Sequence, residues 1–545
     1  MPEYVPNTVV CVLKDIPLDD TYSDTIKFNS VGEQTGYFSA RLKYRFANMT
    51  YQRVNNSVAR PRGPLTVRVP QLADNLYDCN YIMFQNSNYG NKWFYAFIKQ
   101  VNYINPENTE IVYEIDYFQT FLFDFEVNAS FVEREHVADD SLYANTCPEP
   151  LDVDFYCVQA VSTFYIPDMF GGPYIVVACG NDKETAGTIP YGEMYGGIYS
   201  GVYYYYATDA GSVNSFLEQL NGLGKIDLVA GIYMSPLPPT SANVQRSWTA
   251  GFQPSRKTIT GGGKSYTIQN NKLLSYPFTT YKIKSTGGDE RILRPELCGD
   301  NGELGGILYI SSASEPNFML TPDYDHITNN FENSVTYAET VQCAWTKNAF
   351  ATWQAQQGPA NAMKAIAGAT TVFAGVIAGL ATAGTSTLGM IGAGALMSGI
   401  SQTMGAVDER LAAARQPNIP RGAYTTGSMN MATGRTGFEA YHFALNPDCA
   451  RRFDEYFNMY GYEVDRVKVP EMDSRANFNY VKCRNVNITG SLPVDGMDIV
   501  KACFNRGIRL WHTDITRSLL TAPNPIVSHE TNNSGETYNS EVKSK

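Results

Sequence analysis

Over the first 345 or so residues, hydrophobic and polar positions follow one another in short runs. The runs are rich in Val, Ile, Tyr, Phe and Thr, and they are separated by Gly, Pro, Asn and Asp. This pattern is typical of β-strands joined by turns. Residues 92–101, 109–117 and 202–207 are examples, and the turn-forming residues 105–108 between the first two predict an antiparallel hairpin.

The pattern changes abruptly between residues 345 and 417. Residues 365–407 form 43 consecutive positions without a charge: 14 are Val, Ile, Leu, Met or Phe, 10 are Ala, 9 are Gly, 9 are Ser or Thr, and one is Gln. A polar stretch at 382–387 divides them into two arms, 365–381 and 388–404. As a helix each arm would span about 26 Å, close to the hydrocarbon thickness of a bilayer. We therefore predict a hairpin that enters or crosses a membrane.

The hydrophobicity of this segment is modest. Its strongly apolar residues would contribute about −4 to −8 kcal/mol to insertion, before Gly, Ser and Thr oppose it. This favours a segment that is stored in water and released, rather than a permanent anchor. Small residues such as Gly375 and Gly379, four positions apart, would let helices approach closely in lipid.

The same segment is also compatible with a buried hairpin in the core of a water-soluble protein. Its length and the charges that flank it, Lys364 on one side and 408–410 on the other, favour release. The residues by themselves leave both interpretations open.

The chain returns to mixed structure after Pro420. Asn446 and Pro447 are start signals for a helix that Gly461 would end. A strand is expected at 478–483 and a second, short helix at 498–505.

Composition and charge exclude some classes of function. The chain has 545 residues, 18% of them charged, and a formal net charge of −12. An acidic surface repels phosphate backbones, which disfavours a nucleic-acid binder but not a conduit through which nucleic acid passes. The ten cysteines have no close pairs, and the first twenty residues lack the features of a secretory signal, so we expect folding in a reducing cytosol.

Candidate chemistry is sparse. Residues 261–265 (GGGKS) resemble the end of a phosphate-binding loop, but the first glycine of that motif is replaced by Thr258, and a hairpin tip is expected instead. The five histidines have no metal-ligand spacing. We predict no catalytic residues, no metal and no cofactor, although two distant carboxylates of a hydrolase would leave no local motif.

Two stretches carry a family resemblance. The first is 115–137, which includes the string SFVEREHV at 130–137, and the second is 457–512, which ends in GIRLWH at 507–512. Together they resemble the distal tail, or tail knob, proteins of small short-tailed bacteriophages of Gram-positive hosts, the picovirus type. The resemblance extends in order over nearly the whole chain, and in that family a long hydrophobic loop occupies the position of residues 365–404.

The resemblance implies a non-enzymatic virion protein at the tail tip, assembled in the bacterial cytoplasm. It implies a hexameric tube whose hydrophobic loops plug the lumen and later form a pore in the host cytoplasmic membrane for genome ejection. The implied partners are five further copies of the chain, upper tail and lower collar proteins, membrane lipid, and phage DNA that passes without specific binding. Within SFVEREHV, residues Glu133, Arg134, Glu135 and His136 are expected to form local ion pairs and packing contacts.

The expected fold is mainly β with some α: a tail-tube-like β-sheet or barrel domain, an inserted knob domain and a long hydrophobic loop. The expected divisions are a tube-wall segment (1–135), a β-rich knob (136–345), the membrane-active loop region (346–420), an α+β closing segment (421–527) and a flexible tail (528–545). The predicted membrane-active residues are Ile366, Val372, Phe373, Gly375, Val376, Ile377, Gly379, Leu380, Leu388, Met390, Ile391, Leu396, Met397, Ile400 and Met404. A tail-associated cell-wall hydrolase and a receptor-binding adhesin are the alternatives.

Overall fold

The computed structural model describes residues 8–49, 51–53, 65–87, 90–179, 194–195, 198–199, 203–239, 244–311, 317–337, 434–527, 529–531 and 537–539. These residues belong to two compact units that interleave along the chain. Unit 1 comprises 1–152, 266–273 and 448–545, and unit 2 comprises 153–265 and 274–447. The chain therefore passes four times from one unit to the other.

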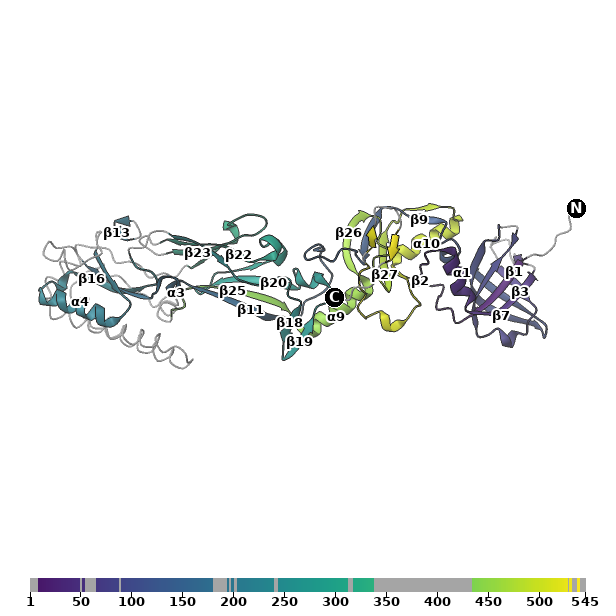
Figure 1. The fold of residues 1–545 in the computed structure, drawn as a ribbon, viewed down its shortest axis with the longest axis horizontal. Coiled ribbons are helices and arrows are strands. Elements are labelled where there is room, and N and C mark those ends of the chain that lie inside the picture. The colour runs from purple at the N-terminus through teal and green to yellow at the C-terminus, as the bar shows by residue number, and fades with distance from the viewer. Residues whose placement is uncertain are drawn as a thin grey trace, which may run out of the picture. The chain divides into compact units, whose positions relative to one another are not determined.

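Unit 1 begins with a seven-stranded antiparallel sheet in the order β3-β1-β6-β7-β8-β5-β4. Its strands are β1 (Thr8–Lys14), β3 (Leu42–Met49), β4 (Tyr51–Arg53), β5 (Leu65–Val69), β6 (Cys79–Gln85), β7 (Trp93–Asn105) and β8 (Asn108–Ile115). The predicted hairpin is confirmed: β7 pairs with β8, and Asn105 lies opposite Asn108 across the turn. Strands β3 and β5 belong to opposite halves of the sheet yet contact each other, so the sheet curls towards a barrel (Figure 1).

The second sheet of unit 1 has five strands in the order β2-β29-β27-β10-β26. They are β2 (Asp24–Ile26), β10 (Ser130–Glu135), β26 (Tyr462–Lys468), β27 (Phe478–Arg484) and β29 (Ile508–Trp511). Both family motifs lie here, because SFVERE forms β10 and IRLW forms β29. Two small two-stranded sheets, β9 (Phe125–Val127) with β28 (Ile488–Gly490) and β30 (His529–Thr531) with β31 (Thr537–Asn539), complete the described strands of this unit.

The core of unit 1 joins these sheets to its helices. The helices are α1 (Val31–Ser39), α2 (Tyr117–Thr120), α9 (Pro447–Tyr460) and α10 (Val494–Arg506). One cluster of buried side chains contains Phe38 from α1, Tyr81 and Tyr95 from the curled sheet, Phe504 from α10 and Trp511 from β29. A second cluster, built around Val12, Ile82 and Ile111, fills the other face of the curled sheet. Burial on both faces explains why these strands are so apolar.

The two helices predicted near the C-terminus are present, and one differs in its start. Helix α9 spans Pro447–Tyr460, as predicted, and Gly461 follows it with a φ of 66°. A Cβ at position 461 would lie 2.0 Å from the Glu135 carbonyl oxygen, so both conformation and space require glycine. Helix α10 begins at Val494, four residues before the predicted Asp498. Its first turn contains Gly496, a weak helix former that hid the start.

Unit 2 contains a sandwich of two four-stranded antiparallel sheets. One sheet has the order β11-β25-β20-β21, with β11 (Tyr156–Tyr165), β20 (Thr279–Ser285), β21 (Glu290–Leu293) and β25 (Gly437–Leu445). The other has the order β17-β22-β23-β24, with β17 (Val244–Thr249), β22 (Gly305–Ser311), β23 (Asn317–Pro322) and β24 (Val335–Tyr337). Tyr281 and Phe438 from the first sheet and Leu308 and Phe318 from the second share one core.

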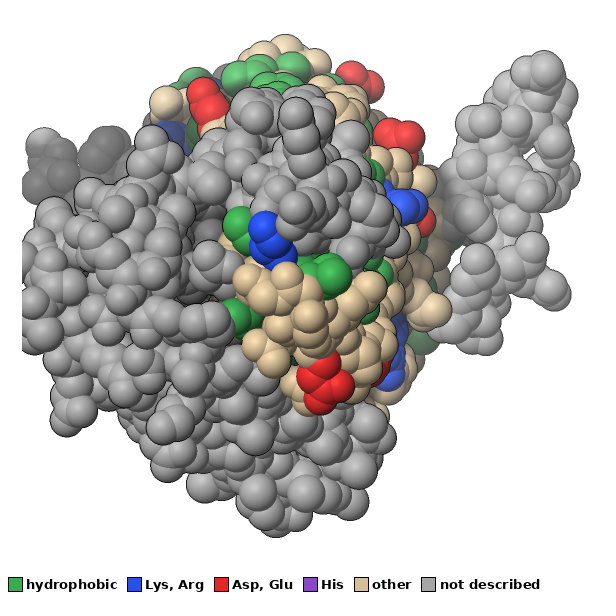
Figure 2. Space-filling view, turned by 90° about the vertical axis from the view of Figure 1, so that its left-hand side faces the viewer, with side chains coloured by type: hydrophobic (Ala, Val, Ile, Leu, Met, Phe, Trp, Pro, Cys, Tyr) green, Lys and Arg blue, Asp and Glu red, His purple; other side chains and the backbone are tan. Residues whose placement is uncertain are grey.

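The other described residues of unit 2 form smaller elements. A three-stranded sheet has the order β15-β12-β16, with β12 (Tyr174–Cys179), β15 (Tyr203–Ala207) and β16 (Val229–Ser235). Helix α4 (Ala210–Gly222) covers it, and Tyr205 stacks on Phe216 with ring centroids 4.1 Å apart. Short elements are α3 (Ile166–Phe170), β13 (Met194–Tyr195) with β14 (Ile198–Tyr199), and β18 (Thr258–Gly261) with β19 (Lys264–Thr267). Figure 2 views the α4 end, where acidic, basic and hydrophobic side chains are interspersed among the described residues.

The GGGKS stretch is a hairpin tip, as predicted. Strands β18 and β19 pair across Gly262 and Gly263, whose φ values of 57° and 75° suit a tight turn.

The five-part division of the chain into tube-wall, knob, loop, closing and tail segments stays a prediction.

Candidate functional site

The predicted membrane-active residues, from Ile366 to Met404, lie outside the described residues. The functional geometry that the structure does describe is at the two ends of the region that contains them. The last described residue before this region is Tyr337 at the end of β24, and the first after it is Gly434, just before β25. Both ends belong to unit 2.

One turn holds both ends. The turn 285–289 joins β20 to β21. On one side the Asp289 carboxylate accepts hydrogen bonds from the Thr336 backbone N–H at 2.9 Å and its hydroxyl at 3.3 Å. On the other side the Thr286 N–H donates to the Gly437 carbonyl at 2.9 Å, and the Gly437 N–H donates to the Thr286 hydroxyl at 3.0 Å. We call Thr286, Asp289, Thr336 and Gly437 the segment clamp.

The clamp is fixed to the core on both sides. Tyr337 is 1% exposed and Phe438 is fully buried, and both belong to the core of the sandwich. Gly437 lies so close to β11 that a Cβ would come within 2.1 Å of the Phe164 carbonyl oxygen. Residues 336 and 437, on either side of the region, are therefore held at one place in the sandwich.

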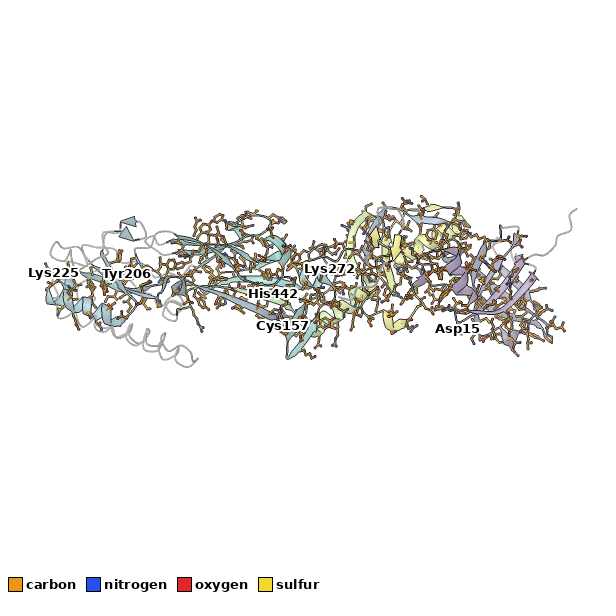
Figure 3. The ribbon with its side chains drawn as sticks, in the orientation of Figure 1. Asp15, Cys157, Tyr206, Lys225, Lys272 and His442 are labelled. Carbon is orange, nitrogen blue, oxygen red and sulfur yellow. The ribbon has the colours of Figure 1, made fainter. Side chains whose placement is uncertain are left out.

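A second group of residues lies in unit 1, where the chain passes to and from unit 2. Glu149 is just before the first passage, Lys272 lies in the short return 266–273, and Glu463 follows the last passage. Glu149 is an ion-pair partner of both Arg134 and Lys272, and Arg134 also pairs with Glu463 at 2.8 Å. The Glu149 side chain is fully buried, and that of Lys272 is 2% exposed (Figure 3, where Lys272 is labelled).

Asp454 completes this group. Its carboxylate accepts hydrogen bonds from the Gln269 N–H at 2.8 Å, the Asn270 N–H at 3.0 Å and the Tyr266 hydroxyl at 2.9 Å. It thereby holds the return segment to helix α9. We call Arg134, Glu149, Lys272, Asp454 and Glu463 the anchor cluster.

The pKa directions in the anchor cluster follow from burial and pairing. Burial lowers the pKa of Lys272, and attraction to Glu149 only partly opposes it. Burial also acts to lower the pKa of Arg134, but Glu149, Tyr456 and Glu463 together outweigh it, and the pKa is raised. For Asp454, burial raises the pKa against the hydrogen bonds that it accepts. Arg134, Glu149, Lys272 and Glu463 thus hold one another as ion pairs, whereas Asp454 is held by neutral hydrogen-bond donors.

The SFVEREHV residues have the structural roles predicted for them. Glu133 pairs with Lys482 at 2.6 Å, and Glu135 pairs with Lys468 at 2.6 Å. His136 is buried, and its Nδ1 accepts a hydrogen bond from the Tyr480 N–H at 2.9 Å. Its proton therefore lies on Nε2, which donates to the carbonyls at the end of α9. Burial and the charge of Arg475 lower the pKa of His136 to about 3.

The sequence indicated that Arg134 forms ion pairs, but not which residues are its partners. Glu149, Lys272 and Asp454 are 15, 138 and 320 positions after Arg134, and no local motif marks them. The sequence STGGD at 285–289 predicts a turn but not which residues the turn binds.

Among the described residues there is no group of three or more His, Cys, Asp or Glu that could hold a metal ion. Within the same residues, no helix has the length and hydrophobicity needed to cross a bilayer.

Family models match two parts of the chain. Residues 243–523 match the model for the C-terminal domain of the tail knob protein gp9 of Bacillus phage phi29. The chain belongs to the tail knob protein family. Residues 6–126 match a second model, that for the N-terminus of caudoviral major tail proteins. The resemblance drawn from SFVEREHV and GIRLWH is confirmed, and the chain is a structural protein of a phage tail and part of the virion.

Relatives of this tail knob family member align along almost their whole length. The tail knob protein gp9 of Bacillus phage PZA is 25% identical, over 94% of this chain and 98% of its own. That of Bacillus phage phi29 is 24% identical with the same coverage. The structure of the bacteriophage C1 tail knob protein gp12 covers 95% of this chain, with a TM-score of 0.56 and 15% identity. The last likeness concerns the fold, and it confirms the expected mainly β tail knob architecture.

Proposed function

We propose that six copies of this chain form the distal knob of a phage tail tube, and that residues 365–404 of each copy plug its lumen before infection. On contact with the host, these segments leave the lumen and form a pore in the cytoplasmic membrane through which the genome passes. The protein acts by a change of conformation and not by catalysis. Upper tail and lower collar proteins are its neighbours in the virion, and assembly takes place in the host cytoplasm.

The observation that supports this proposal most strongly is the segment clamp. A loop that leaves the fold and returns at one place can exchange one environment for another without unfolding the sandwich that holds it. Thr286 and Asp289 hold residues 336 and 437, which lie on either side of the loop in the sequence, to a single turn, so movement of the loop need not break β24 or β25. An uncharged stretch of 43 residues between two points held in this way fits a hydrophobic insertion device.

The charge of the chain supports the conduit role. With a net charge of −12, a tube built of this protein would not bind DNA through the release of counterions. DNA would then pass without specific binding.

Dye release from liposomes tests membrane insertion. The purified full chain is mixed with dye-loaded liposomes at neutral and mildly acidic pH, beside a variant that lacks residues 365–404. We expect leakage with the full chain and none with the deletion. A matched pair of variants refines the test: Val376→Asp places a charge in the first arm and should abolish leakage, whereas Thr385→Asp changes the polar stretch between the arms and should preserve it.

Two further measurements separate the alternatives. Solubilisation of purified cell walls that survives the deletion would identify a hydrolase, and binding to whole cells without leakage would identify an adhesin. Negative-stain images should show six-fold rings with an occluded centre in the full chain and an open centre in the deletion variant. Rings that are already open in the full chain would contradict the plug.

A further inference from the structure

Strand β11 is an edge strand whose second half, after a register shift between Val158 and Ala160, has neither charge nor proline. Its ten residues, YCVQAVSTFY, include no charge and no proline. The strand order places β25 on one side of it and no described strand on the other. The β18 hairpin reaches its first half, where the Gln159 side chain bonds both the N–H and the carbonyl of Thr260 at 2.9 Å. Along the second half, residues 160–165, no described strand pairs with the backbone donors and acceptors on this side.

The outward face beside this edge combines exposed apolar side chains with Lys282, which is paired within the chain to Glu290. Val161 lies opposite Tyr441, Tyr441 opposite Lys282, and Lys282 opposite Ile292, so these side chains form one row across the sheet. Val161 is 51% exposed and Ile292 is 64% exposed. In the neighbouring row, Val158 lies opposite Phe443, whose ring stacks on Tyr441 at 5.8 Å. Figure 1 shows β11, β25 and β20 side by side in this sheet.

The opposite edge of the same sheet is chemically suited to β11. Strand β21 has the sequence ERIL, and its two charges are already paired within the chain, Glu290 with Lys282 at 2.5 Å and Arg291 with Asp289 at 3.0 Å. Its exposed apolar side chain is Ile292, on the same face as Val161. A copy that docked β21 against β11 would bring no unpaired charge to an uncharged strand and would place its Ile292 beside Val161.

An edge strand of unit 1 shows the contrast. Strand β26 borders the five-stranded sheet, and it exposes Val467 by 69%. Its sequence, YEVDRVK, places the exposed charges of Asp465 and Arg466 along the edge. Charges of this kind are the common means by which proteins prevent edge-to-edge pairing. Strand β11 has none of them.

We propose that residues 160–165 of β11, with the adjoining outward row of their sheet, bind the β21 edge of a second copy of this chain. The two surfaces differ, so each subunit offers one and receives the other, as a closed ring requires. The inference rests on the proposed assembly into a ring and names the surface through which it forms.

The test is the oligomeric state of the full chain. Mass photometry over a dilution series should show rings for the wild type. Val161→Lys and Val161→Glu each place a charge on the edge and should move the dissociation midpoint to about tenfold higher concentration or more, with an unchanged circular dichroism spectrum. The use of both signs of charge excludes a new ion pair as the cause. Val467→Lys, at an exposed valine of an edge that already has charges, is the matched control and should leave the midpoint unchanged.

Cross-linking identifies the partner strand. Within one chain, positions 161 and 292 are three strand spacings apart, about 14 Å. A bismaleimide with a reach of about 8 Å should therefore join Val161→Cys/Ile292→Cys chains to one another and should not join either single variant beyond the wild-type background. If rings persist in both Val161 charge variants and no cross-linked oligomers form, the β11–β21 interface is wrong, although the chain still forms a ring. A wild type that is monomeric at every concentration would overturn the ring and this surface together.

Discussion

The anchor cluster and the segment clamp both hold segments that are distant in sequence, but they use different chemistry. In unit 1, Glu149 and Lys272 are charges removed almost completely from water. In unit 2, the clamp uses backbone groups, hydroxyls and the Asp289 carboxylate, whose side chain is 29% exposed. A buried charge is tolerated only while its partner is present, whereas a partly exposed hydrogen bond can be exchanged for one with water. The anchor cluster is therefore expected to be rigid, and the segment clamp is expected to open more easily.

Removal of a charge from the anchor cluster should have the largest effect. Glu149→Gln leaves Arg134 and Lys272 without their shared counterion and should lower the free energy of unfolding by about 3–5 kcal/mol. The measurement is denaturant unfolding at pH 7. The double variant Glu149→Gln/Lys272→Met removes one of the stranded charges as well and should recover part of the loss. A single variant as stable as the wild type would show that the cluster is not a buried ion network.

His136 should make stability depend on pH. Its pKa is lowered to about 3 in the folded chain, from about 6.5 in the unfolded chain. The unfolded chain therefore binds more protons in acid, and stability falls as pH drops from about 6.5 towards 3. Between pH 7 and pH 5 this histidine should account for about 2 kcal/mol of lost stability. Between pH 7 and pH 5, His136→Gln should lose about 2 kcal/mol less stability than the wild type. An equal loss in both proteins would contradict the assignment.

Loss of a clamp contact should cost less. Asp289→Ala removes the acceptor for Thr336 and should lower the free energy of unfolding by about 1 kcal/mol, because the freed N–H can reach water. Asp289→Asn keeps an acceptor oxygen and is the control. Limited proteolysis should show faster cleavage near residue 337 in the alanine variant. A loss as large as that of Glu149→Gln would remove the distinction between the two sites.

The smallest effect is expected for an exposed ion pair. Lys282 pairs with Glu290, whose side chain is 47% exposed. Lys282→Met keeps the aliphatic part of the side chain and should change the free energy of unfolding by less than about 0.5 kcal/mol. Because both variants remove one charge of an ion pair, the difference between Lys282→Met and Glu149→Gln measures the effect of burial. Thermal unfolding at two salt concentrations is the measurement.

Local features of the fold could be predicted wherever the backbone decides them. The hairpin around Asn105 and Asn108, the GGGKS tip and helix α9 all follow from residues that favour one conformation over a few positions. The start of α10 was misplaced because Gly496 weakens the helical signal. Neither the anchor cluster nor the clamp could be predicted, since each contact joins residues whose separation in the sequence contains no information about their distance in space.

The sequence by itself determined the β texture, the uncharged segment at 365–407 and membership of the tail knob family, because these depend on composition, local conformation and motif strings. Only the tertiary structure decided that Glu149 and Lys272 are buried together, that one turn holds Thr336 and Gly437, and that β11 is an edge. The physical reason is that burial and strand order are properties of the folded chain as a whole. An ion pair, a clamp or an open edge exists only after distant segments have met.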